Sequence, residues 1–319
     1  MKIFDNPHVQ TLYATYAPHP SLAMVRERFE RPDGDFVDCD WAVSMPSKDH
    51  QKPIAVLFHG LTGSSKSPYM LRSMLHLREA GFDAVAMHFR GCSGEPNRLP
   101  RSYHSGDTQD AIAWLRHLRQ LYRGRAIVAA GFSLGGNMLL KLLAEADVSA
   151  LPDAAAAVSA PMDLALSAER IDRGISRLYQ RHLLTTLRAQ LDAKYDRFDM
   201  EALIGLPREK LGKLATFRAF DDAYTAPIHG FDGVDDYYAR CSAKPLLGRI
   251  GTPTLIVHAK DDPFTGDGVI PRKSELSASI ECAIRKHGGH LGFVEGSFLR
   301  PRFWLYEGIT EFFRSKIGL

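Results

Sequence analysis

The sequence has few cysteines, no long apolar run and no excess of charge of one sign. Its four cysteines lie far apart in the 319 residues, and no two share the spacing of a metal-binding or redox motif. We therefore expect free thiols in a reducing cytoplasm, with no metal site. The longest purely apolar runs are about five residues, against the ~20 that a membrane-spanning helix needs, so no integral membrane segment is expected.

The charges are nearly balanced, with 40 Lys and Arg against 37 Asp and Glu. Basic and acidic residues are interspersed, whereas a nucleic-acid binder needs a clustered basic surface to displace phosphate counterions. Nucleic acid is therefore excluded as a partner. Asp5, Asn6 and Pro7 come too early for the apolar core of a signal peptide, so no secretory signal is expected.

Short apolar runs alternate with helical patterns along most of the chain. Strands are expected at the following places: two within 26–45 around a turn at 32–35, then 54–58, 84–89, 126–131, 154–158, 254–257 and 280–284. Helices are expected over 68–81, from Asp107 with Asp107 and Asp110 as a capping pair, over 138–146, and at the end through Phe303 to Phe313. This alternation predicts an α/β fold with a mostly parallel central sheet, helices on both faces and sites at the carboxyl ends of the strands.

The alternation breaks in the middle of the chain. Residues 162–245 carry mixed helical patterns, many charges and no clear buried strand. We interpret this stretch as an inserted helical cap. The predicted organisation is a core of residues 1–161 and 246–319 with a cap of residues 162–245.

The motif Gly131-Phe132-Ser133-Leu134-Gly135 lies between an expected buried strand and an amphipathic helix. A serine with glycines two residues to either side forms a nucleophile elbow in that setting, because the sharp turn leaves room only for glycines. The helix that follows would point its N-terminal amides and positive dipole end at an anionic intermediate. Ser133 is the predicted nucleophile.

A serine nucleophile needs a base and an acid that orients the base. In α/β-hydrolases the chain order is Ser, then Asp or Glu, then His. His290 lies in a glycine-rich loop after the last expected strand and is the predicted base. Asp261 and Asp262 follow the preceding strand, and we favour Asp262 because it stands directly before Pro263.

The oxyanion hole of such an enzyme consists of two backbone amides. One belongs to the residue after the nucleophile, Leu134. The other lies in the loop 59–65, where Leu61 is the first candidate and Thr62 the alternative. Arg90 is expected to brace loops, Cys92 to be a packed thiol, and His104 and Asp107 to lack a joint catalytic role.

The whole set of motifs resembles the YheT-like α/β-hydrolases, known as α/β-hydrolase fold family 4. The resemblance covers nearly the whole chain and rests on these stretches: Asn6-Pro7-His8-Val9-Gln10-Thr11, 59–65, 89–94, 131–137, 220–238, Asp261-Asp262-Pro263-Phe264 and 288–293. One departure is His88, where asparagine is expected. The resemblance implies an α/β-hydrolase fold, a triad of Ser133, His290 and one aspartate of the pair, and a cytoplasmic esterase-type activity.

These observations predict a serine carboxylic-ester hydrolase for short- to medium-chain acyl esters, without metal or organic cofactor. The predicted partner is a small-molecule acyl ester, with loose lipid contact at most. Two alternatives use the same residues. The first is an acyltransferase that passes the acyl group to an alcohol, and the second is a scaffold of the same fold that binds a ligand without turnover.

Overall fold

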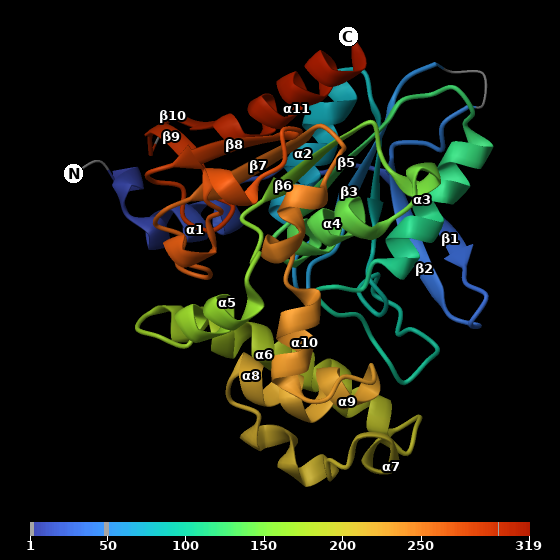
Figure 1. Cartoon of the computed structure of the whole chain (residues 1–319), viewed down its shortest axis with the longest axis vertical. Helices are drawn as coiled ribbons and strands as arrows, with labels where there is room; N and C mark the ends of the chain where they lie inside the picture. Colours follow the sequence, from blue (N-terminus) through green and yellow to red (C-terminus); the bar gives the residue numbers. More distant parts are fainter. Residues whose placement is uncertain (1–2, 48–50, 299) are drawn as a thin grey trace.

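The computed structural model describes residues 3–47, 51–298 and 300–319. At its centre lies an eight-stranded sheet, shown in Figure 1, whose order is β1-β2-β4-β3-β5-β6-β7-β8. The strands are β1 (Met24–Glu30), β2 (Phe36–Ala42), β3 (Ile54–Phe58), β4 (Asp83–Met87), β5 (Ile127–Phe132), β6 (Ala154–Val158), β7 (Thr254–Ala259) and β8 (Ile280–Arg285). β1 and β2 form an antiparallel hairpin that joins β4, and every pairing from β4 through β3 to β8 is parallel. The prediction of a mostly parallel sheet is confirmed.

Helices cover both faces of this sheet. They are α2 (Pro68–Glu79), α3 (Gln109–Leu121), α4 (Leu134–Glu145) and α11 (Trp304–Ile317). The N-terminal helix α1 (Pro7–Tyr16) packs against α2. Alternate residues of one strand enter different cores, as period-two geometry requires. Val56 of β3 packs in the core with α3 and α4, whereas Leu57 packs in the core with α2 and α11. Strands such as β3 are apolar throughout because both of their faces are buried.

Between β6 and β7 the chain is helical. The elements are α5 (Leu164–Ile171), α6 (Ser176–Tyr195), α7 (Met200–Ile204), α8 (Phe217–Phe220), the π-helical turn η4 (Asp221–Thr225), α9 (Ala226–Ile228) and α10 (Val234–Cys241). They gather at one end of the sheet, at the bottom of Figure 1. Two small cores of their own hold them together. The division of the chain into a core and a cap at residues 162–245 stays a prediction.

Three local expectations differ from the structure. α3 begins at Gln109 rather than Asp107, and the Asp110 carboxyl binds Arg31 and Arg90 instead of capping the helix. Phe303 belongs to a second, two-stranded sheet of β9 (Val294–Ser297) and β10 (Arg300–Phe303), so the last helix starts one residue later. The N-terminal helix α1 was not expected. The short 3-10 helices are η1 (Ile3–Asp5), η2 (Val148–Ala150), η3 (Arg208–Lys213), η5 (Lys244–Arg249), η6 (Asp267–Val269) and η7 (Lys273–Glu275).

Candidate active site

Ser133 occupies a strained turn between β5 and α4. Its backbone has φ +52° and ψ −121°, a region that a residue with a side chain adopts only when its surroundings force it. The two motif glycines leave space for this turn. A Cβ on Gly135 would lie 2.5 Å from the carbonyl oxygens of Phe58 and His59, and a Cβ on Gly131 would overlap the Gly135 carbonyl. The turn therefore requires glycine at both positions.

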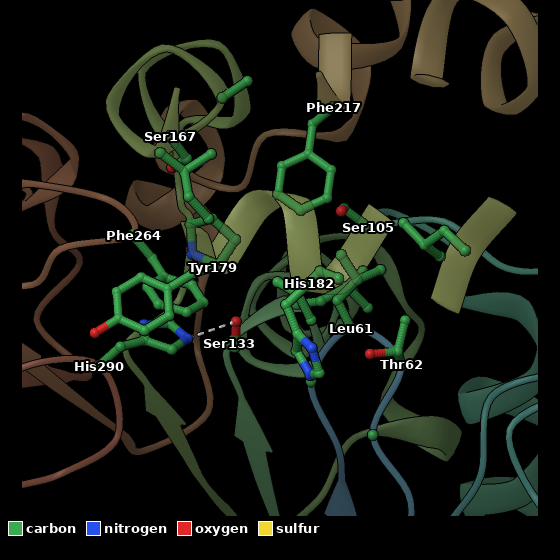
Figure 2. Close-up of a pocket in the computed structure, with 18 of the residues that line it drawn as sticks. Leu61, Thr62, Ser105, Ser133, Ser167, Tyr179, His182, Phe217, Phe264 and His290 are labelled. Carbon is green, nitrogen blue, oxygen red and sulfur yellow. Dashed lines mark hydrogen bonds between the residues drawn. The ribbon is translucent and has the colours of Figure 1, made fainter. Parts of the chain in front are cut away.

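The imidazole of His290 lies between Ser133 and Asp262. Its Nε2 is 3.0 Å from Ser133 Oγ, the contact drawn as a dashed line in Figure 2. Its Nδ1 is 2.9 Å from Asp262 Oδ2. Phe264 stacks on the ring with parallel planes and centroids 4.0 Å apart. The structure thus brings together three residues that are up to 157 positions apart in the chain.

Asp262 is an ionised carboxylate that lies 1% exposed after β7. Burial by itself would raise the pKa of this group. The neighbouring His290 and His258 and the N–H of Phe264, which donates to Oδ1 at 2.8 Å, more than offset that effect and hold the pKa below its usual value. The carboxylate accepts from Nδ1–H of His290 and leaves Nε2 as the basic nitrogen that faces Ser133.

Asp261 has a different set of partners. Its Oδ1 accepts from the N–H groups of Gly288 and Gly289, both at 3.0 Å, and its Oδ2 lies 3.1 Å from His287 Nδ1. These bonds shape the loop that carries the histidine. Of the two aspartates left open by the sequence, Asp262 is the one within hydrogen-bond distance of His290.

The N-terminal helix α1 holds the histidine loop in place. The backbone N–H of His290 donates to Thr11 Oγ1 at 2.9 Å, and the Thr11 hydroxyl donates to the Pro7 carbonyl at 2.8 Å. The approach is so close that a Cβ on Gly289 would overlap the Pro7 carbonyl. Asn6 caps this helix and Pro7 is its first residue, a helix-start signal that sequence reasoning missed but could have used. Nothing local to it indicated the contact with residue 290.

Gln10 fixes the chain just after the histidine. Its Oε1 accepts from the N–H of Val294 at 2.7 Å, and its Nε2 donates to the Val294 carbonyl at 3.1 Å. A buried amide that satisfies both polar groups of one residue acts like a strand neighbour. Gln10 and Thr11, the last two residues of the Asn6–Thr11 motif, thus both hold the loop that carries His290 through hydrogen bonds.

The two expected oxyanion donors differ from the alternative in their hydrogen bonds. The N–H of Thr62 donates to Tyr103 Oη at 2.9 Å and is therefore occupied. For Leu61 and Leu134, no acceptor for the backbone N–H occurs among the described residues. Leu134 is the first residue of α4, where helix geometry leaves the N–H groups free and the dipole is positive. Gly60, the residue before Leu61, approaches Ser133 so closely that a Cβ on it would lie 3.1 Å from Ser133 Cβ, and Leu61 and Ser133 line the same cavity (Figure 2).

Two buried histidines set the shape of the loop 59–65. His59 accepts from the N–H of Phe89 through Nε2 at 3.1 Å, so its Nδ1–H donates to the Gly60 carbonyl at 2.7 Å. Burial and the adjacent His88 lower the pKa of His59 to about 3, which keeps it neutral. His88, the departure from the expected asparagine, accepts from the N–H of Ser65 at 3.0 Å. Both rings therefore brace this loop.

A cavity of about 420 Å³ opens above Ser133 and is bounded by α1, α5, α6 and the turns around η4. Leu61, Ser133 and His290 line its floor. Its remaining wall is mainly apolar, with these side chains among others: Leu183, Leu187, Leu191, Phe217 and Phe220. A site of this volume and character suits a small apolar group next to a few polar atoms.

The other candidate residues have structural partners. Arg90 is buried and pairs with Asp33, Asp35 and Asp110, so it braces loops. Burial raises the pKa of Cys92 to about 12, as for a packed thiol. Among the helices in the described part of the chain, none combines the length and the apolar character of a membrane-spanning segment. In the same part of the chain, no group of three or more His, Cys, Asp or Glu is placed to hold a metal ion.

Comparison with known proteins shows that this chain is similar to members of one family. The sequence model of the alpha/beta hydrolase fold matches residues 53–297. "Putative esterase YheT" of Escherichia coli is 43% identical over 312 residues, which cover 98% of this chain and 91% of that protein. "Phospholipase ABHD3" of Mus musculus is 29% identical and covers 93% of this chain and 73% of its own. The solved esterase Pf2001 of Pyrococcus furiosus shares the fold, with a TM-score of 0.57, 14% identity and coverage of 92% and 93% of the two chains.

Proposed function

This chain belongs to the alpha/beta hydrolase fold family and to its YheT-like esterases, and from that premise we propose that it hydrolyses carboxylic esters through Ser133. The observation that carries the proposal is the unbroken contact from Ser133 Oγ through His290 to Asp262, at 3.0 and 2.9 Å. Membership in a hydrolase family supports the view that this chain is an enzyme. We propose Ser133 as its nucleophile, Asp262 as the acid that orients the histidine, and a carboxylic ester as its substrate.

In this mechanism Ser133 Oγ attacks the ester carbonyl while His290 Nε2 takes its proton. Asp262 keeps the proton of the imidazole on Nδ1 and stabilises the imidazolium that forms. The N–H groups of Leu61 and Leu134 bind the negative oxygen of the tetrahedral intermediate. His290 then returns the proton to the leaving alcohol, and water, activated by the same imidazole, cleaves the acyl-enzyme.

The substrate class follows from the cavity. We propose that residues 162–245 act as a cap, whose α6 and α8 supply the apolar wall above Ser133. A cavity of about 420 Å³ suits an acyl chain of short to medium length better than a long one. The mechanism requires neither metal nor organic cofactor. The cytoplasmic location and the loose lipid contact stay predictions, which subcellular fractionation tests.

The test is hydrolysis of p-nitrophenyl esters with acyl chains from two to twelve carbons. The wild type should turn over the short to medium chains, and Ser133→Ala should lose activity by roughly 10⁴-fold or more. Ser315→Ala is the matched control, since its hydroxyl lies on α11 and donates to the Phe312 carbonyl. Unchanged turnover in Ser133→Ala would end the proposal, and ester products formed with added alcohol would favour acyl transfer over hydrolysis.

A further inference from the structure

A polar group interrupts the apolar wall of the cavity at the π-helical turn η4. Asp221 and Thr225, the two ends of this turn, both line the cavity that contains Ser133. Tyr238 of α10 lines it beside them. π-Helical turns are rare and occur frequently at functional sites. The turn belongs to the 220–238 motif of the sequence, which the proposed mechanism leaves without a role.

The Asp221 carboxyl has hydrogen-bond donors but no cation. Thr225 Oγ1–H donates to its Oδ1 at 2.8 Å, and Tyr238 Oη–H donates to its Oδ2 at 2.9 Å. No charged partner in the described part of the chain acts on this group, and burial raises its pKa to about 6 against the effect of the two hydroxyls. An ionised carboxyl accepts about four hydrogen bonds. Two of them are made here, so acceptor capacity remains on a group that borders the cavity.

The next residue shows what a purely structural aspartate does in this segment. Asp222 is exposed, and its Oδ1 accepts from the N–H of Val234 at 3.0 Å, at the first residue of α10. That bond ties the turn to the helix. Asp222 does not line the cavity around Ser133. The two adjacent aspartates therefore have different roles, since Asp221 borders the cavity and Asp222 holds α10. A substitution of Asp222 can thus serve as the control for a substitution of Asp221.

Asp221 belongs to a wall of the cavity that lies on the side of Ser133 away from His290, where we expect the acyl part of the substrate to bind. Tyr237, next to Tyr238, accepts from the N–H of Ser105 at 3.0 Å, so this wall joins the loop 102–105. In Figure 2, Ser105 lies on the same side of Ser133 as Leu61 and Thr62, while His290 lies on the other. The leaving alcohol must be near His290, which protonates it. An acyl chain directed away from His290 would then run toward the wall that holds Asp221.

We propose that Asp221, with Tyr238 and Thr225, forms a subsite that binds a hydrogen-bond donor on the acyl chain, a hydroxyl or an ammonium group remote from the scissile carbonyl. The natural substrate is then an ester of a hydroxy- or amino-substituted acid rather than of a plain alkanoic acid. This inference rests on the proposed esterase function and extends it by specifying a polar group at the far end of the acyl chain.

The kinetic test uses p-nitrophenyl esters of six to ten carbons in three series, ending in methyl, hydroxyl or ammonium. At one chain length the wild type should prefer the hydroxyl or the ammonium ester over its methyl counterpart by at least about tenfold in kcat/KM at pH 8. Asp221→Leu should abolish that preference by lowering kcat/KM for the hydroxyl and ammonium esters, while Asp222→Asn, at a residue that does not line the cavity, should preserve it. Asp221→Asn, which preserves the shape of the side chain, should lose a preference for ammonium but keep part of one for hydroxyl.

A binding measurement separates this inference from the proposed chemistry. In Ser133→Ala, the ω-hydroxy or ω-amino acid product should raise the melting temperature more than the plain acid of equal length, and Asp221→Leu in that background should remove the difference. Equal binding and equal kcat/KM for the three series at every length would overturn the subsite. So would a preference that persists in Asp221→Leu. Absence of all ester turnover with the binding difference intact would contradict the proposed function alone.

Discussion

Thr11→Val removes one hydroxyl from the helix that supports the catalytic loop. The substitution preserves the volume and the branched shape of the side chain, but the N–H of His290 loses its acceptor at 2.9 Å. The Pro7 carbonyl loses its donor at 2.8 Å as well. Thr11 and His290 are only 6% and 8% exposed, so the N–H that loses its acceptor lies in a largely buried region.

The size of the effect follows from the unpaired N–H. A buried donor without an acceptor costs about 1–3 kcal/mol, which corresponds to a fall in melting temperature of roughly 2–6 °C. If the loop moves to relieve that cost, His290 Nε2 leaves its position 3.0 Å from Ser133 Oγ. A displacement of ~1 Å in a catalytic group costs up to about 100-fold in rate, so we expect kcat to fall by about 10- to 100-fold with KM within about twofold.

The assay combines steady-state kinetics on a p-nitrophenyl ester with thermal unfolding. Thr11→Ser retains the hydroxyl and should recover kcat to within about threefold of the wild type, even if the lost methyl group lowers stability. A structural role alone would lower the melting temperature and leave kcat unchanged. A wild-type kcat in Thr11→Val would therefore show that the Thr11 hydroxyl of α1 does not position the imidazole of His290.

Three further predictions concern other parts of the molecule. Asp262→Asn should lower kcat by roughly 10³- to 10⁴-fold, whereas Asp261→Asn should cost less than about tenfold and mainly destabilise the loop; equal losses in steady-state kinetics would contradict the assignment. Gly135→Ala should destabilise the fold by more than about 3 kcal/mol in urea unfolding, because its Cβ would lie 2.5 Å from backbone oxygens of the loop after β3. Burial and the adjacent Asp110 raise the pKa of Asp107 to about 6, so folding favours the protonated carboxyl and its contribution to stability is lost as the pH rises through 6. Relative to Asp107→Asn, the wild type should lose about 2 kcal/mol of unfolding free energy between pH 4 and pH 7, and a constant difference would count against that pKa.

The buried strands could be predicted because their signal is local. β3, β5 and β6 are continuous apolar runs, and only a strand buried on both faces needs such a run. The elbow at Ser133 is local too, since its glycines meet backbone within a few residues or from the adjacent strand. These features fix the carboxyl edge of the sheet, where the candidate site lies.

The parts that escaped prediction depend on contacts between distant segments. α1 is short and weakly amphipathic, and its purpose becomes visible only where Thr11 meets His290, 279 residues further along. The position before Pro263 favoured Asp262 over Asp261 in the sequence, but only the coordinates show in which direction each carboxyl points and that Asp262 lies against His290. The π-helical turn at Asp221 has no sequence signature of its own.

In the proposed mechanism an acyl group becomes covalently bound to Ser133 Oγ. Intact-mass measurement after treatment with a fluorophosphonate, followed by peptide mapping, tests whether Ser133 is the nucleophile. We expect one adduct per chain in the wild type, located on Ser133, no adduct in Ser133→Ala, and much slower labelling in a His290→Ala variant. An adduct on another residue, or an unmodified wild-type chain that still hydrolyses esters, would contradict the proposed mechanism.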